Sequence, residues 1–87
     1  MQFQGSIITE QGITFAIISV KQHIVNNKSE SEKIILAFTP IFPNIPIILM
    51  AFDSIGRATY FGRKDIVNFL VGVPIQNIPW KEYTVNI

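Results

Sequence analysis

The stretch Ile34–Phe52, IILAFTPIFPNIPIILMAF, contains nineteen residues and no charged side chain. A membrane-spanning helix needs about 20 apolar residues in an unbroken hydrogen-bond ladder. Here Pro40, Pro43 and Pro46 interrupt the run. Each proline in a helix interior removes a donor and clashes with the preceding turn, which costs about 3 kcal/mol or more. We therefore predict that the stretch forms the interior of a folded domain and not a membrane span.

The first part of this stretch continues a helix that begins upstream. Ser29 and Glu32 have the spacing of a capping box. Three apolar residues then recur on one helix face: Ile34, Ile35 and Phe38. Because a proline pushes the preceding residue toward extended geometry, we expect a helix over about residues 30–39 and then a rigid, buried connection. The alternative, an exposed proline-rich ligand segment, lacks the flanking Arg or Lys that such ligands use.

The last part, Ile47–Phe52, is apolar at every position, which predicts a strand covered on both faces. Asp53 and Gly56 occupy the first and fourth positions of a predicted type I turn. Arg57–Phe61 is then expected to return as the second strand of a hairpin.

The rest of the chain supplies three further strands and a second helix. Residues 3–9 and 13–20 predict an opening hairpin. Four apolar residues after Gly62 have the spacing of a helix face: Ile66, Phe69, Leu70 and Val73. Tyr83, Val85 and Ile87 alternate with polar residues, as in a half-buried final strand.

These elements predict a single α+β domain over residues 1–87 with the order β-β-α-β-β-α-β. A mixed five-stranded sheet packed against two helices is the economical arrangement. If both helices lay on one face, the other face would expose apolar side chains of the two central strands.

The composition is poor in charge. Only 15% of the residues are Asp, Glu, Lys or Arg, and the net charge is +1, whereas soluble domains carry about 25% charged residues. A surface short of ions favours association, so we expect a homodimer or another protein partner. A well-packed monomer with an Asn-, Gln- and Ser-rich surface is the alternative. Nucleic-acid binding driven by bulk charge lacks the basic excess it requires.

Candidate chemistry is scarce. The chain has no cysteine and one histidine, His23, so thiol and zinc–thiolate sites are excluded. No pair of acidic residues has ligand spacing, and the glycines are single. We expect no enzyme, no metal and no cofactor; the enzyme alternative would require a cleft holding His23 with Asp53 or Glu82. The segment MQFQGSIITE is not a secretory signal, so we expect a cytoplasmic protein.

One cluster is a candidate for binding a small anion or nucleic acid: Arg57, Tyr60, Arg63 and Lys64. A helix that starts after Gly62 offers free backbone N–H groups to an anion, and Tyr60 is suited to stacking on a base. Against this, Asp65 adds a negative charge, and residues three apart on a strand point to opposite faces. We favour a solvated turn over a binding site.

Two resemblances concern the second half of the chain. Residues 44–71, with Asn44-Ile45-Pro46 before an apolar strand, a hairpin and a helix, partly resemble the C-terminal half of a thioredoxin-like domain. That resemblance implies a cis bond before Pro46; the redox cysteines of the family are absent. The block RATYFGRKDIVNFL is similar to small uncharacterised bacterial proteins of cyanobacterial type. That resemblance gives no activity to transfer to this chain.

The function expected from the sequence is therefore a non-enzymatic interaction module that self-associates through an apolar sheet face or edge. Binding of an anion or nucleic acid is the alternative. Trp80, the only tryptophan, is expected to close one end of the core or to anchor a contact.

Overall fold

The computed structural model describes residues 1–85 of the chain. Its elements are β1 (Gln2–Glu10), β2 (Ile13–Ser19), α1 (Gln22–Val25), α2 (Lys28–Phe38), β3 (Ile47–Phe52), β4 (Ala58–Phe61), α3 (Lys64–Val71), the 3-10 turn η1 (Ile75–Asn77) and β5 (Lys81–Thr84). The predicted α+β class, with a mixed five-stranded sheet and two main helices, is confirmed.

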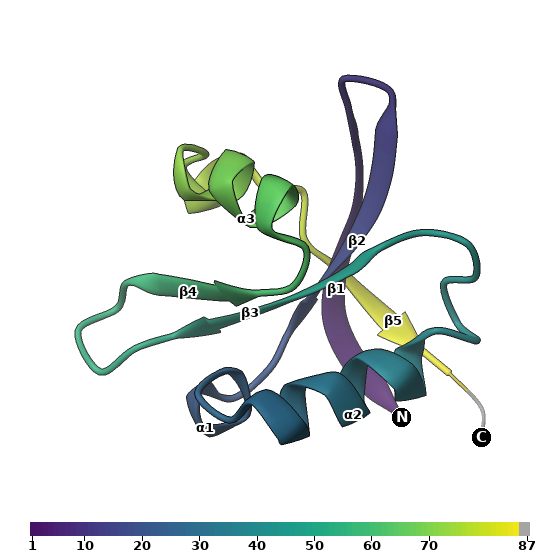
Figure 1. Ribbon diagram of the computed structural model, residues 1–87. Coiled ribbons are helices and arrows are strands. Elements are labelled where there is room, and N and C mark those ends of the chain that lie inside the picture. The colour runs from purple at the N-terminus through teal and green to yellow at the C-terminus, as the bar shows by residue number, and fades with distance from the viewer. Residues whose placement is uncertain (86–87) are drawn as a thin grey trace.

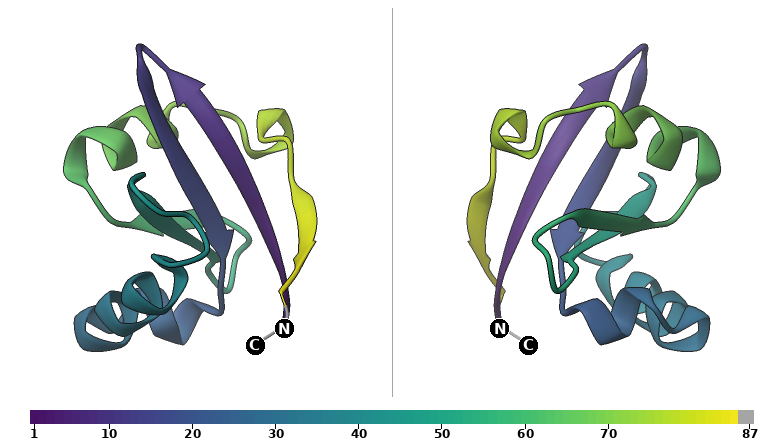
Figure 2. Two further views of the ribbon diagram at one scale, coloured as in Figure 1. Left: turned by 90° about the vertical axis from the view of Figure 1, so that its right-hand side faces the viewer. Right: turned by 90° about the vertical axis from the view of Figure 1, so that its left-hand side faces the viewer.

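The strands lie in the order β4-β3-β2-β1-β5 (Figure 1). β2 and β3 are parallel, and the other neighbours are antiparallel. A parallel pair needs a long crossover connection, and α1, α2 and the proline segment supply it. β5 lies beside β1 (Figure 2), so β4 and β5 are the two edges of the sheet.

The two main helices cover opposite faces of the sheet. Ile17 and Ile48 pack in one core cluster with Ile66 and Leu70 of α3. Their sequence neighbours Ile18 and Leu49 point the other way and pack in a second cluster with Phe38 of α2. Figure 1 accordingly shows α3 on one side of β3 and β4, and α2 on the other. The condition for a bare apolar face, with both helices on the same side, is therefore not met.

The uncharged stretch is part of the folded domain, as its prolines predicted. It forms the end of α2, the proline connection and β3. Every β3 residue except Phe52 is buried, because both faces of that strand are covered. Phe42 of the connection is buried, while Pro43 and Asn44 are exposed. Among the described residues no helix is long and apolar enough to cross a membrane.

The structure differs from the prediction at the start of α2. The N-cap is Asn27, whose Oδ1 accepts a hydrogen bond from the N–H of Glu30 at 3.1 Å, and Ser29 lies inside the helix. The segment between β2 and α2, for which the sequence analysis predicted no helix or strand, contains the short helix α1.

Other differences are smaller. Phe69 faces outward and is 37% exposed, although its spacing predicted burial with Ile66 and Leu70. The Ile45–Pro46 bond is trans, since the described chain has no cis peptide bond. β5 covers Lys81–Thr84; the predicted continuation to Asn86 and Ile87 lies outside the described residues.

Gly62 fixes the junction between β4 and α3. Its φ of +154° is one that side-chain-bearing residues rarely adopt, and a Cβ there would meet Cδ1 of Ile48 at 2.5 Å. The absence of a side chain therefore lets the backbone pass directly over β3, which places α3 against the sheet.

Candidate functional site

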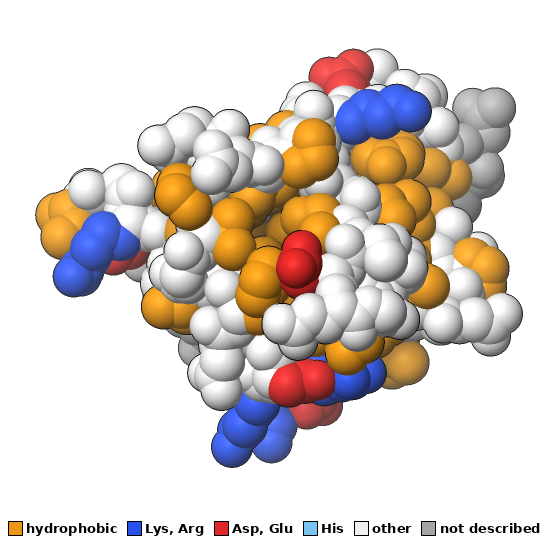
Figure 3. All heavy atoms as spheres, turned by 90° about the horizontal axis from the view of Figure 1, so that it is seen from above, with side chains coloured by type: hydrophobic (Ala, Val, Ile, Leu, Met, Phe, Trp, Pro, Cys, Tyr) orange, Lys and Arg blue, Asp and Glu red, His pale blue; other side chains and the backbone are white. Residues whose placement is uncertain are grey.

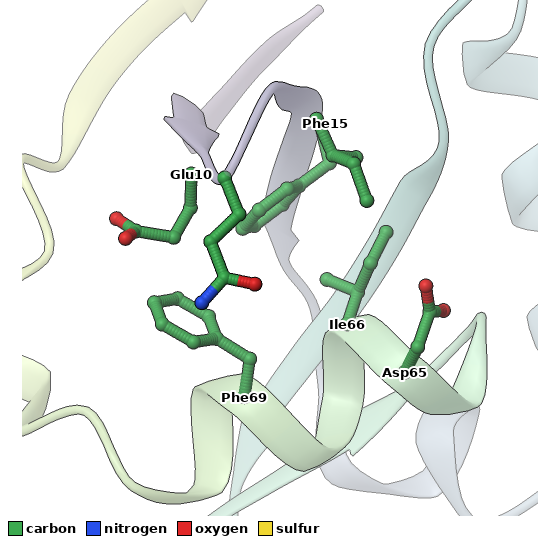
Figure 4. Close-up of a pocket in the computed structure, with 7 residues that line it drawn as sticks. Glu10, Phe15, Asp65, Ile66 and Phe69 are labelled. Carbon is green, nitrogen blue, oxygen red and sulfur yellow. The ribbon is translucent and has the colours of Figure 1, made fainter.

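Three hollows lie on the α3 face of the sheet. The turn hollow, about 110 Å³, lies between the β1–β2 turn and α3 (Figure 4). The edge hollow, about 290 Å³, lies between β4 and the end of α3. The tryptophan hollow, about 350 Å³, is lined by Met50, Phe52, Ile75 and Trp80, with Gln4 and Ser19. Trp80 thus packs against the core and also reaches a surface depression.

Unsatisfied polar groups are found on the same face. Within residues 1–85, the buried hydroxyls of Ser6 and Tyr60 have no hydrogen-bond partner. Strand alternation places Ser6 on the side of Ile8, and both Ile8 and Tyr60 pack against the α3-side cluster. Burial raises the pKa of the Tyr60 phenol. A buried polar group without a partner costs about 1–3 kcal/mol, so each of these two hydroxyls lowers the stability of the fold.

The predicted cationic residues are not gathered into one site. Arg57 precedes β4 and Arg63 follows it, and six residues of extended strand span about 20 Å. Tyr60, between them, packs its ring against the core and is not free to act as a stacking platform.

Each arginine is bound to its own neighbouring carboxylate. Nε of Arg57 donates to Asp53 at 3.0 Å, and Arg63 makes two hydrogen bonds to Asp65, at 2.8 and 2.7 Å. The pKa of Asp53 is lowered chiefly by the backbone N–H of Arg57, and that of Asp65 by the Arg63 guanidinium. Lys64 is exposed and forms no ion pair within the described chain. The anion-binding hypothesis therefore stays a prediction, with Lys64 as its free cation.

His23 is exposed on α1. Across residues 1–85 it forms no ion pair with Asp53 or Glu82. The described part of the chain also contains no group of three or more His, Cys, Asp or Glu residues able to hold a metal ion. The expectation of a non-enzymatic protein therefore stays a prediction.

The two edge strands differ in charge. β5 carries Lys81 and Glu82, and charged side chains on an edge discourage pairing with another chain. β4 has the sequence ATYF, with neither charge nor proline. The outer edge of β4 therefore lacks the charged side chains and prolines that discourage pairing with another strand.

The backbone of β4 offers free groups at that edge. The carbonyl of Arg57 accepts from the N–H of Asp53 at 2.8 Å, so Arg57 is turned toward β3. Hydrogen-bonding direction alternates along an antiparallel strand, so Ala58 and Tyr60 direct their N–H and C=O groups away from β3. The sequence alone did not show that β4 is an edge strand. The only indication was the uncharged run between Arg57 and Arg63.

Comparison with protein-family models, with curated proteins and with solved structures gives no match to this chain. Functional inference rests on the geometry just described.

Proposed function

We propose that this chain is a non-enzymatic interaction module that self-associates by pairing β4 with β4 of a second copy. The observation that supports it is the free outer edge of β4, where Ala58 and Tyr60 present unpaired backbone groups on a strand without charge. Because helices cover both faces of the sheet, self-association through the sheet would use an edge strand. On β5, the charges of Lys81 and Glu82 discourage such pairing. A reducing, cytoplasmic setting suits such a chain because it has no cysteine.

The pairing is expected to be antiparallel and two-fold symmetric. In such an isologous contact the same patch serves both copies, and antiparallel strands exchange hydrogen bonds in matched pairs. The result is one continuous sheet shared by two copies. The flanking ion pairs Asp53–Arg57 and Arg63–Asp65 are each internally neutral, so they bring little repulsion to the contact.

Apolar surface beside β4 would be buried in the same step. The edge hollow adjoins β4, and Val71 on its wall is 73% exposed, while Ile55 in the neighbouring turn is 71% exposed. A stable interface covers about 800 Å² per partner, roughly a seventh of the 5606 Å² surface of the chain. Strand pairing alone is too small for this, so the hollow and Val71 are expected to contribute.

Sedimentation equilibrium at tens of micromolar tests the proposal with matched proline variants. Proline at an outward-facing edge position removes one outward N–H and leaves the inner ladder intact. Ala58 is such a position on β4. Glu82 is the matching position on β5. Met1 and Val85 exchange backbone hydrogen bonds, so every second residue counted back from Val85 is turned toward β1, and Glu82 lies between two of these and faces outward.

The wild type and E82P should be dimers. A58P should be a folded monomer, or its dimer should dissociate at least about tenfold more readily. A tenfold change corresponds to the loss of one hydrogen bond at each of the two symmetric positions. A wild-type monomer throughout this range, or an A58P dimer as tight as the wild type, would exclude β4 pairing. Circular dichroism confirms that each variant is folded.

A further inference from the structure

The turn hollow combines two aromatic rings with two carboxylates. Phe15 of β2 and Phe69 of α3 line it together with Glu10 and Asp65 (Figure 4). Gln11, Ile13 and Ile66 complete the lining, and no Lys or Arg is among these residues. The face of an aromatic ring carries partial negative charge and attracts cations. Apart from the neutral amide of Gln11, the side chains that line the hollow are acidic or apolar.

The two carboxylates are not equivalent. Asp65 is held by two hydrogen bonds from Arg63, so its charge is already balanced. Glu10 forms no ion pair or side-chain hydrogen bond with any residue of the described chain. Figure 3, seen from above, shows apolar side chains gathered across the middle of one face, with an acidic group among them and Lys and Arg at the margins. The unbalanced negative charge at the hollow is therefore that of Glu10.

The volume restricts the ligand to one small group. Pockets for drug-sized molecules measure about 300–1,000 Å³, whereas this hollow measures about 110 Å³. An ammonium with a few methylenes is of the right size. Its charge would lie near Glu10 and the exposed ring of Phe69, and its methylenes would contact Ile13 and Ile66. A phosphate or carboxylate would be repelled by Glu10.

We propose that the turn hollow binds an alkylammonium group, either the end of a lysine side chain on a partner or a free polyamine. This site is separate from β4 and does not depend on self-association. Phe69, whose outward position departs from the burial expected of its helical spacing, forms one aromatic wall of the site.

The test is a two-dimensional NMR titration of the folded chain with n-butylammonium chloride. Its neutral isostere n-butanol is the matched probe, and sodium chloride controls for ionic strength. n-Butylammonium should give saturable shifts at the amides of Gln11, Ile66 and Phe69 with millimolar affinity, and n-butanol should not. E10Q should weaken binding about three- to fivefold and F69L about two- to fivefold. E32Q, which removes an exposed carboxylate on α2, should have no effect.

Equal binding of n-butanol, unchanged binding by E10Q, or shifts that do not saturate would each overturn the proposal. Spermidine and N-acetyl-lysine methylamide identify the source: tighter binding of one assigns the site to free polyamines or to lysine side chains, and equal binding supports a general alkylammonium site. Failure of both overturns it. A58P serves as a second background, in which the same titration is expected whatever the outcome of the dimer test.

Discussion

The two faces of the sheet are both covered, but they are closed to different degrees. On the α2 face, four aromatic rings seal the core: Phe3, Phe38, Phe42 and Tyr83 pack with centroids 4.8–6.1 Å apart. The buried hydroxyl of Ser31 on this side donates to the carbonyl of Ile24 at 2.7 Å. On the α3 face, an eight-residue helix and an irregular segment leave the turn, edge and tryptophan hollows, and within residues 1–85 the two unpartnered hydroxyls lie on this face.

The difference concerns how completely each face is covered. On the α2 face, Phe3 and Tyr83 from the two ends of the described chain pack against Phe38 and Phe42. The short α3 spans only part of its face, so side chains there meet solvent at the edges of the helix. Buried polar groups without partners are rare in folded proteins, and among the described residues both of them lie on the α3 face.

The largest effect that would sharpen this comparison is expected from Phe38→Ala. Phe38 packs edge-to-face on Phe3 at 4.8 Å and is buried, so its removal leaves a cavity in the closed face. We expect the free energy of unfolding to fall by about 3–5 kcal/mol, measured by urea denaturation. Leu36→Ala, at a 71% exposed position of the same helix, is the control and should change stability by less than about 0.5 kcal/mol. Similar losses in the two variants would contradict the sealed α2 face.

An intermediate effect is expected from one substitution made on both faces. Ser31→Ala removes one of the two hydrogen bonds to the carbonyl of Ile24, which keeps the one from the N–H of Asn27, so stability should fall by about 1 kcal/mol. Ser6→Ala removes a hydroxyl that has no partner, so stability should be unchanged or rise by up to about 1 kcal/mol. Thermal and urea unfolding measure both. Two losses of equal size would show that the faces do not differ in polar satisfaction.

The smallest effect concerns pH. The folded-state pKa of Asp65 is lowered, first by its hydrogen bonds from Arg63. Its contribution to stability is therefore present above the ordinary aspartate pKa of about 4 and is lost as the pH falls through the lower folded value. Both side chains are half exposed, so the loss should be small. D65N should reduce the fall in the urea midpoint between pH 5 and pH 2. An unchanged pH dependence in D65N would mean that the pair contributes nothing.

The sequence predicted those parts of the fold that depend on local pattern. The run Ile47–Phe52 is apolar at successive positions, so it had to be a strand with both sides covered, and the structure confirms this. The start of α2 was placed less well, because Asn27 and Ser29 are both good caps and only the geometry selects Asn27. α1 was missed because four residues in a polar segment are too few to show helical periodicity.

The candidate sites were much less accessible to prediction. The turn hollow joins Glu10 and Phe15 to Asp65 and Phe69, and no spacing rule connects a hairpin turn to a helix so distant in sequence. The anion cluster was suggested by closeness in sequence, but an intervening strand separates Arg57 from Arg63. Which strand becomes an edge depends on the order of the whole sheet, so the exposure of β4 followed only from the structure.

The pairing of β5 with β1 has a consequence for biosynthesis. Gly5 lies opposite Lys81. The outer edge of β1 therefore has no neighbour until residues 81–84 have been translated. Contacts of such long range form late, because the loop they close is costly in entropy. A chain that ends before Lys81 would therefore expose an unpaired row of backbone groups on β1, which favours pairing with other chains.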